Sequence, residues 1–212
     1  LDRARNEWRF EVRVGKPANL TAVDAGTKTG RGDFKCILTG DPIPAEYVRK
    51  EGQAGRIRDR LLAIVAEGQR GRAYLALLEE QEEIARVRVP EGAPETDLPE
   101  QALGFRVQNY GMLKHRDLFT PRQLTALVTF SDIVAEARER VAADARESGM
   151  AEGLGLEAGG SEARAFGDAV AVYLGACSSR SADYWASLCI WAGDFVAHVF
   201  GRNALSMVMD FA

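Results

Sequence analysis

The sequence predicts an α+β fold in which a small N-terminal β-rich, ribbon-like unit precedes a helical subdomain of long packed helices. Two patterns lead to this prediction. Apolar and charged side chains alternate over residues 8–14, with the period of two that a half-buried strand requires. Over residues 120–147 the apolar side chains instead recur with the period of a helix face. We therefore expect a β-rich unit over 1–88, a linker and loop over 89–119, and helices over 120–212.

Further strand candidates extend the β-rich unit. Residues 34–38 form one, and the preceding segment 15–32 is rich in Gly, Thr and Asp, as in a loop. Residues 61–65 and 73–77 are typical of the two strands of a hairpin, because a Gly-containing turn at 67–71 separates them.

The helical part begins at the clearest start signal in the chain. Thr120 can cap a helix, Pro121 suits its first position, and Gln123 completes a Thr-x-x-Gln capping box. A shorter helix is expected earlier, over 78–87, where glutamates favour helix. An acidic, proline-containing linker at 89–101 should separate the two helices.

A Gly-rich break at 149–160 should end the first long helix. We expect Ser161 to cap a second one, which runs towards Trp191, and Asp194 to cap a last helix that closes near Gly201. The second helix carries an apolar stripe, which we interpret as core. Its members are Phe166, Ala169, Val170, Tyr173, Leu174, Cys177, Tyr184, Trp185 and Leu188.

Composition indicates a globular protein, with 46% apolar and 27% charged residues among 212. The start at Leu1 and the apolar last residues lead us to expect a piece of a longer protein. No apolar run approaches the ~20 residues of a membrane helix, and no signal peptide is evident. We expect cytoplasmic localisation, no membrane partner, and free thiols at Cys36, Cys177 and Cys189.

Charge is unevenly distributed along the chain. The net charge is -4, yet residues 1–72 carry 15 Lys/Arg against 10 Asp/Glu, and residues 73–212 carry 12 against 21. The densest basic run is a candidate DNA-binding surface, because Lys and Arg neutralise phosphates. A solvated charged face explains it equally well. The run comprises Arg49, Lys50, Arg56, Arg58 and Arg60, joined across the hairpin by Arg70 and Arg72.

A second candidate contact is the turn Asn109-Tyr110-Gly111, which would expose an amide and a ring for contact with a base or a cofactor. Turn chemistry alone also explains Asn and Gly there.

Several motif-like stretches predict no chemistry, and no catalytic residue is expected. Gly153-Leu154-Gly155 has the spacing of a dinucleotide-binding loop, but it follows a helix instead of a strand. Asp41-Pro42-Ile43-Pro44 lacks the aromatic side chain that would stack on a flipped base. His115 with Asp117, and His198 with Asp194, have no evident nucleophile nearby.

Asn109-Tyr110-Gly111-Met112, followed by residues 117–124, also carries a family resemblance, which extends from about Phe10 to Ala212. The chain resembles the middle segment of long microbial proteins described as adenine-specific DNA methylases that contain a zinc ribbon. In that family the segment lies between a glycine-rich cofactor motif and an Asp-Pro-Pro-Tyr motif. Neither motif occurs here, so the resemblance implies S-adenosylmethionine for the parent protein, no cofactor in this segment, and no activity of the segment alone.

The resemblance also implies a degenerate zinc ribbon. Cys36-Ile37-Leu38-Thr39-Gly40 is similar to its second Cys-x-x-Cys-Gly knuckle, with Thr39 in place of the second cysteine. Zinc sites of this kind use four soft ligands, and a Thr hydroxyl substitutes poorly for a thiolate. No metal site is therefore expected within the segment, although residues before Leu1 could complete one.

The position between the two motifs implies a noncatalytic, target-recognition-like insert of a DNA adenine-N6 methyltransferase, with DNA and the remainder of the methylase chain as partners. The alternative is a protein-docking or scaffold module of a phage-defence methylase complex, whose partners would be other defence proteins. An independent enzyme is a weaker third interpretation, because no cleft with converging titratable groups can be assembled from the sequence.

Overall fold

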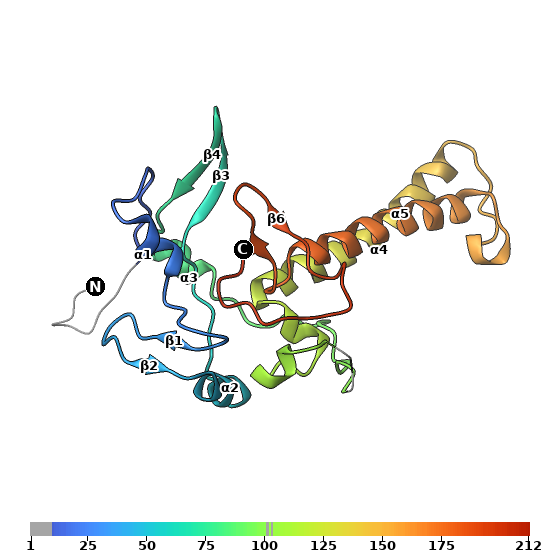
Figure 1. The fold of residues 1–212 in the computed structure, drawn as a ribbon. Coiled ribbons are helices and arrows are strands. Elements are labelled where there is room, and N and C mark those ends of the chain that lie inside the picture. The colour runs from blue at the N-terminus through green and yellow to red at the C-terminus, as the bar shows by residue number, and fades with distance from the viewer. Residues whose placement is uncertain (1–9, 101, 103) are drawn as a thin grey trace. The chain divides into compact units, whose positions relative to one another are not determined.

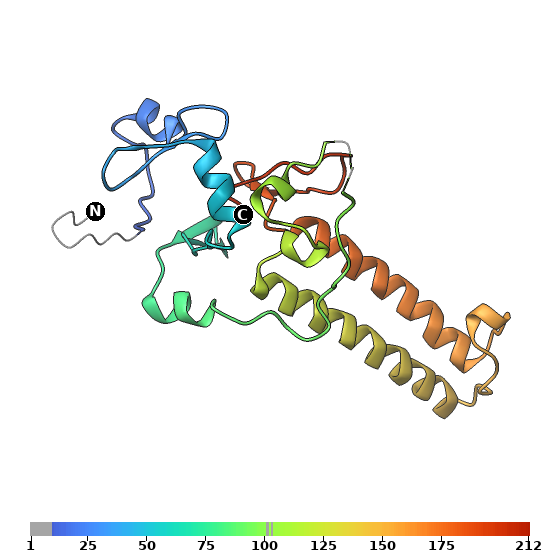
Figure 2. The same cartoon turned by 90° about the horizontal axis from the view of Figure 1, so that it is seen from below.

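The computed structural model describes residues 10–100, 102 and 104–212 (Figures 1 and 2). It confirms an α+β fold, built from helices and three two-stranded antiparallel sheets in the described ranges. The described residues form two compact units. Unit 1 contains residues up to 87 together with 104–113, and unit 2 contains 88–103 together with 114–212. Segment 104–113, which the sequence analysis placed in the linker, thus belongs to unit 1.

Unit 1 opens with helix α1 (Leu20–Ala25), which lies inside the segment expected to be a loop. The side chain of Asn19 caps it by accepting a 3.0 Å hydrogen bond from the Ala22 amide. The strand expected over 8–14 is wrong for its described part, since residues 10–14 form no strand and Val14 is 81% exposed. A strand requires a hydrogen-bonded neighbour, which alternation of side chains does not supply. Residues 8 and 9 lie outside the described residues.

Strands β1 (Phe34–Lys35) and β2 (Pro42–Ile43) form the first sheet, with Phe34 opposite Ile43. The strand expected at 34–38 is thus shorter than predicted. A tight turn joins the pair, in which the Gly40 amide donates to the Cys36 carbonyl at 2.9 Å. Helix α2 (Ala45–Gln53) follows directly, so part of the expected β-rich unit is helical.

The expected hairpin is confirmed as β3 (Ile64–Gly68) and β4 (Gly71–Leu75). Gly68 lies opposite Gly71, so a two-residue loop connects the strands, and Gly71 has a φ of +124°. This short loop moves each strand closer to the turn than the sequence pattern suggested. Helix α3 (Glu79–Ile84) lies within the helix predicted at 78–87, and 3₁₀ helix η1 (Val107–Tyr110) returns to this unit.

Unit 2 contains the two long helices. Following 3₁₀ helix η2 (His115–Leu118), α4 (Pro121–Glu147) begins with the predicted capping box. The Thr120 hydroxyl accepts from the Gln123 amide at 3.2 Å, and the Gln123 side chain accepts from the Thr120 amide at 2.8 Å. The prediction of this helix is therefore confirmed to its last residue.

Helix α5 (Ala163–Tyr184) packs antiparallel against α4, and the two form a long hairpin (Figures 1 and 2). Small residues permit this contact. An added Cβ at Gly167 would lie 2.6 Å from the Arg138 carbonyl oxygen, and Ala163 is fully buried. The predicted core stripe is therefore wrong for Phe166 and Tyr173, which are 52% and 76% exposed. Large side chains would hold the helices apart, so the small-residue face is the one that packs.

The ends of α5 and the C-terminal segment also differ from the prediction. Glu162, not Ser161, precedes the helix, which stops at Tyr184 before reaching Trp191. The helix expected from Asp194 is instead a hairpin of β5 (Ile190–Trp191) and β6 (Val196–Ala197). Gly193, with a φ of +85°, makes the tight turn between them.

Buried Asp183 organises this C-terminal segment. Its Oδ1 accepts hydrogen bonds from the Val199 and Phe200 amides at 3.0 and 2.6 Å, and its Oδ2 pairs with Arg180 at 2.7 Å. The Asp183 carboxylate therefore accepts hydrogen bonds from two backbone amides that lie outside strands β5 and β6. Among the described helices, none combines the length and apolar character needed to cross a bilayer.

Candidate nucleic-acid interface

The two sequence-predicted sites of unit 1 meet at a close backbone contact between α2 and η1. Gly52, which is buried, lies against the backbone of Tyr110, and a Cβ there would overlap the Tyr110 carbonyl. Gly111 has a φ of +87°, and a Cβ on it would lie 2.5 Å from the Gly52 carbonyl oxygen. Two glycines are required for this approach. The structure thus joins the helix that carries Arg49 and Lys50 to the Asn-Tyr turn, although the two segments are far apart in the sequence.

A polar face runs along this junction. The Gln53 side-chain amide donates to the Asn109 carbonyl at 3.2 Å, and Arg49 lies one helical turn before Gln53 on the same side of α2. Asn109 and Arg49 are exposed, whereas Tyr110 is half-buried. We call Arg49, Gln53 and Asn109 the junction face. Gln53 was missed from the sequence because residues 45–53 were assigned to the β-rich unit and not to a helix. The helix-compatible Glu46 and Lys50 pair, four residues apart, was the available signal.

Among the seven basic residues, Lys50, Arg56 and Arg60 form ion pairs. Lys50 pairs with Glu46 at 2.9 Å, which lowers the pKa of that carboxyl through a hydrogen bond. Arg56 binds both carboxylate oxygens of Glu51, at 2.6 and 2.7 Å. The hydrogen bond from Arg56 likewise holds the pKa of Glu51 below its usual value.

Arg60 is the third paired residue. It binds both oxygens of Glu82 in α3, at 2.7 and 3.3 Å, and its guanidinium lies 5.7 Å from the centre of the Phe10 ring. Arg60 therefore connects three segments of unit 1. It has a structural role in addition to any contact with a ligand.

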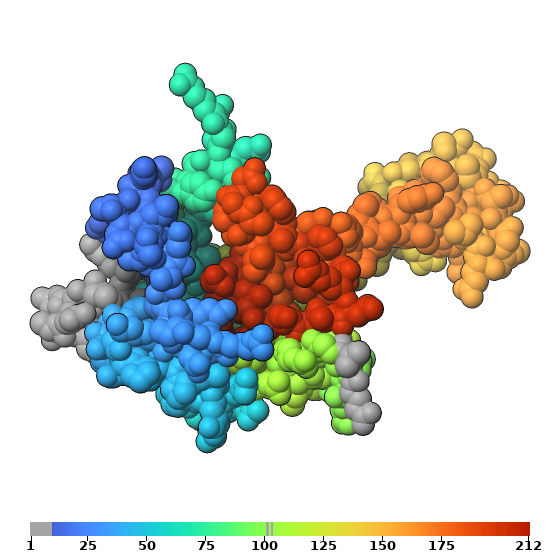
Figure 3. All heavy atoms as spheres, viewed as in Figure 1, coloured from blue at the N-terminus to red at the C-terminus, as the bar shows by residue number. Residues whose placement is uncertain are grey.

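The remaining four basic residues are exposed. Arg49, Arg58 and Arg70 form no ion pair with any residue that the structure describes. Arg70 lies in the two-residue turn of the β3–β4 hairpin, whose tip stands clear of the rest of its own unit (Figure 3). Arg72 lies opposite Glu67 across the hairpin. Positive charge available to an anion is thus concentrated on Arg49, Arg58 and Arg70.

The knuckle-like turn at Cys36 keeps its shape through Thr39. The Thr39 hydroxyl accepts from the Asp41 amide at 3.2 Å, and a hydrogen bond from Thr39 is the largest cause of a lowered pKa of the Cys36 thiol. Within the described ranges, no group of three or more His, Cys, Asp or Glu side chains is placed to hold a metal ion. The Thr39 hydroxyl therefore stabilises the turn through a hydrogen bond to the backbone.

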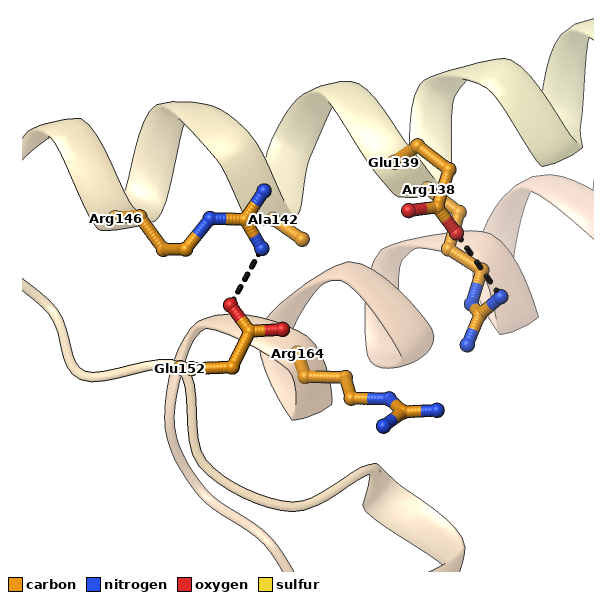
Figure 4. A pocket seen from close by; sticks show the side chains of 6 residues that line it. All are labelled: Arg138, Glu139, Ala142, Arg146, Glu152 and Arg164. Carbon is orange, nitrogen blue, oxygen red and sulfur yellow. Dashed lines mark hydrogen bonds and ion pairs between the residues drawn. The ribbon is translucent and has the colours of Figure 1, made fainter.

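A charged pocket of about 160 Å³ lies near the tip of the α4–α5 hairpin and is lined by Arg138, Glu139, Ala142, Arg146, Glu152 and Arg164 (Figure 4). The charged side chains at this pocket form contacts that stabilise the fold. Arg138 pairs with Asp168 at 2.6 Å, and the other Asp168 oxygen accepts from the Leu156 amide at 2.8 Å. These contacts, the Leu156 amide first, lower the pKa of Asp168. They hold the connecting loop, including 3₁₀ helix η3 (Leu156–Ala158), against the hairpin.

The same loop contains Gly153-Leu154-Gly155. It lies between two helices, and the first two amides of α5 donate to the carbonyls of Ala151 and Glu152 at 3.0 and 3.1 Å. Amides at that position would be needed to bind a pyrophosphate. The structure therefore supplies a physical reason against a dinucleotide-binding role.

The two His and Asp pairings that were set aside have structural roles. Asp117 accepts from the Lys114 amide at 2.8 Å and stabilises the start of η2, while His115 contacts Thr96 at 3.1 Å. His198 lies 3.4 Å from Asp183. None of these contacts leaves a reactive group beside a described cleft.

Comparison of the chain with protein-family models, with curated proteins and with solved structures finds no match.

Proposed function

We propose that unit 1 contacts DNA through the junction face, Arg58 and Arg70, as a noncatalytic, target-recognition-like part of an S-adenosylmethionine-dependent DNA adenine-N6 methyltransferase. The observation that supports this most is the α2–η1 contact, which brings Gln53, one helical turn after exposed Arg49 on α2, against the backbone of Asn109. Cations position a phosphate backbone, and amides suit the groups beside it. The family assignment in this proposal rests on the resemblance of the sequence.

The ion pairs of Lys50 and Arg56 are compatible with this function. Their side chains are 68% and 61% exposed, and exposed pairs contribute little to stability. A phosphate can therefore replace a carboxylate as the partner at little cost to the fold. DNA binding would then recruit charge that the free protein neutralises internally.

The test is duplex-DNA binding by fluorescence anisotropy at about 50 and 200 mM salt, compared between the native chain and a variant with Arg49, Arg58 and Arg70 changed to Ala. Phosphate contacts by Arg49, Arg58 and Arg70 alone predict that the native chain loses about 40-fold in affinity between the two salt concentrations, and recruitment of Lys50 and Arg56 would increase this loss. The variant should bind weakly at both. The matched control changes Arg122, Arg140 and Arg202 in unit 2 to Ala, and it should bind as the native chain does. A native chain that is folded and does not bind would overturn the proposal.

A second candidate function is protein docking, favoured by the exposed side of α5. Phe166, Val172 and Tyr173 are 52%, 63% and 76% exposed, on a helix that already packs by its small residues. Exposed apolar side chains in such density are typical of a protein-binding surface. A protein docked on this apolar surface would bind with little dependence on salt. A chain that acts only by such docking should not bind duplex DNA in the anisotropy experiment, so that experiment separates the two functions.

A further inference from the structure

The side chains of Asn109 and Gln53 differ chemically from the arginines around them. Each amide presents one donor group and one acceptor side by side, whereas a phosphate oxygen offers only acceptors. Among the described residues, the Asn109 side-chain amide has no hydrogen-bond partner, and Gln53 uses only its Nε2, to donate to the Asn109 carbonyl. Both side chains are exposed. Paired donors and acceptors therefore face solvent within the proposed DNA-binding unit.

The backbone beneath these amides is firmly held. Asn109 lies in η1, which begins at fully buried Val107 and ends at Gly111 in the left-handed region. The contact with Gly52 fixes the turn against α2. A side chain carried on an ordered backbone loses less conformational entropy when it binds. Asn109 is thus better suited to specific recognition than an amide on a loose loop.

We propose that Asn109 and Gln53 hydrogen-bond to the edges of DNA bases, and that Arg49 binds an adjacent phosphate. This inference rests on the proposed function and adds that unit 1 reads sequence directly. Asn and Gln amides match the donor–acceptor pairs that base edges present in the major groove. Arg49 on the preceding turn of α2 supplies the positional contact that such readout uses.

The experiment uses the 212-residue chain and a pool of duplexes with a randomised core, sequenced before and after selection for binding. The native chain should enrich a preferred sequence. Asn109→Ala and Gln53→Ala should each lower the affinity for the selected sequence about 5- to 100-fold more than the affinity for the unselected pool, and the salt slope should stay native. Arg49→Ala should weaken binding to both pools equally and reduce the salt slope by about 1.

Asn203→Ala, an exposed asparagine of unit 2, is the matched control and should retain the full preference. Circular dichroism establishes that each variant is folded, and Gln53→Ala provides a second amide deletion that changes no residue of η1 itself. Salt-dependent binding without an enriched sequence, or equal loss of affinity for both pools in Asn109→Ala, would overturn base readout and leave DNA contact standing. No binding by the folded native chain would overturn both.

Discussion

Unit 1 and unit 2 are stabilised by different interactions. Eleven of the twelve buried apolar residues found in the described ranges belong to unit 2, and unit 1 contributes only Val107. Unit 1 instead relies on the Gly52–Gly111 contact, tight turns and the ion pairs of Arg56 and Arg60. Burial of apolar surface is the main source of folding free energy. We therefore expect unit 2 to have the larger intrinsic stability.

The largest expected effect concerns buried Asp183 in unit 2. Asp183→Ala removes the acceptor of the Val199 and Phe200 amides and the partner of Arg180, so the free energy of unfolding should fall by about 3 kcal/mol. Urea denaturation measures the change. Asp144→Ala, which breaks only an exposed pair on α4, should cost no more than about 0.5 kcal/mol. Equal effects of the two variants would contradict the organising role of Asp183.

The next effect tests the weaker core of unit 1. In Gly52→Ala the new methyl group meets the Tyr110 backbone, which cannot rotate away, so α2 and η1 should separate at a cost of about 2 kcal/mol. Amide hydrogen exchange should accelerate over 45–53 and 107–111 and remain unchanged in α4. Glu46→Gln, on the outer face of α2, should leave exchange nearly native. Unchanged protection in Gly52→Ala would refute the close approach.

Two glycines within α5, Gly167 and Gly175, test how closely this helix packs against α4. Gly167→Ala places a methyl group against the Arg138 carbonyl and should destabilise the hairpin by about 1 to 3 kcal/mol. Gly175→Ala meets no atom within 4 Å and should stabilise the same helix by about 0.5 to 1 kcal/mol. Thermal melting of both variants gives the signs. A shift of the melting temperature in the same direction for both substitutions would contradict this close packing of Gly167.

The smallest effect is a pH dependence at the hairpin tip. The pKa of Asp168 is lowered in the folded chain, so its contribution to stability is complete above the unfolded pKa of about 3.9 and is lost as pH falls through the folded value. Asp168→Asn should therefore narrow the stability difference between pH 7 and pH 3 in urea denaturation. NMR titration should show an Asp168 pKa below that of an ordinary aspartate. A raised pKa would contradict the pairing with Arg138 and Leu156.

The sequence predicted the elements whose signals are local. The capping box of Thr120 and Gln123, and the turn between β3 and β4, depend on neighbouring residues and are present as expected. The errors arose where tertiary packing decides. Periodicity marked the side of α5 that carries Phe166 and Tyr173, but the choice of packing face depended on how closely Gly167 approaches α4.

The junction face could be predicted only in part, for the same reason. Arg49 and Asn109 were identified by their chemistry, yet the packing of their elements, α2 and η1, depends on a contact between residues that are distant in sequence. Gln53 could be identified only from the structure, in which α2 is a helix and the Gln53 side-chain amide donates to the Asn109 carbonyl. The residue types can be read from the sequence, but the backbone contact between α2 and η1 brings the residues together.

Amide hydrogen exchange of the native chain with and without duplex DNA tests the central claim most directly, because it compares both units in one sample. We predict that DNA protects 45–53 and 107–111 while the exposed side of α5 around Phe166 and Tyr173 exchanges as before. Protection confined to α5, or no protection anywhere at a DNA concentration that saturates binding by anisotropy, would contradict DNA contact through the junction face.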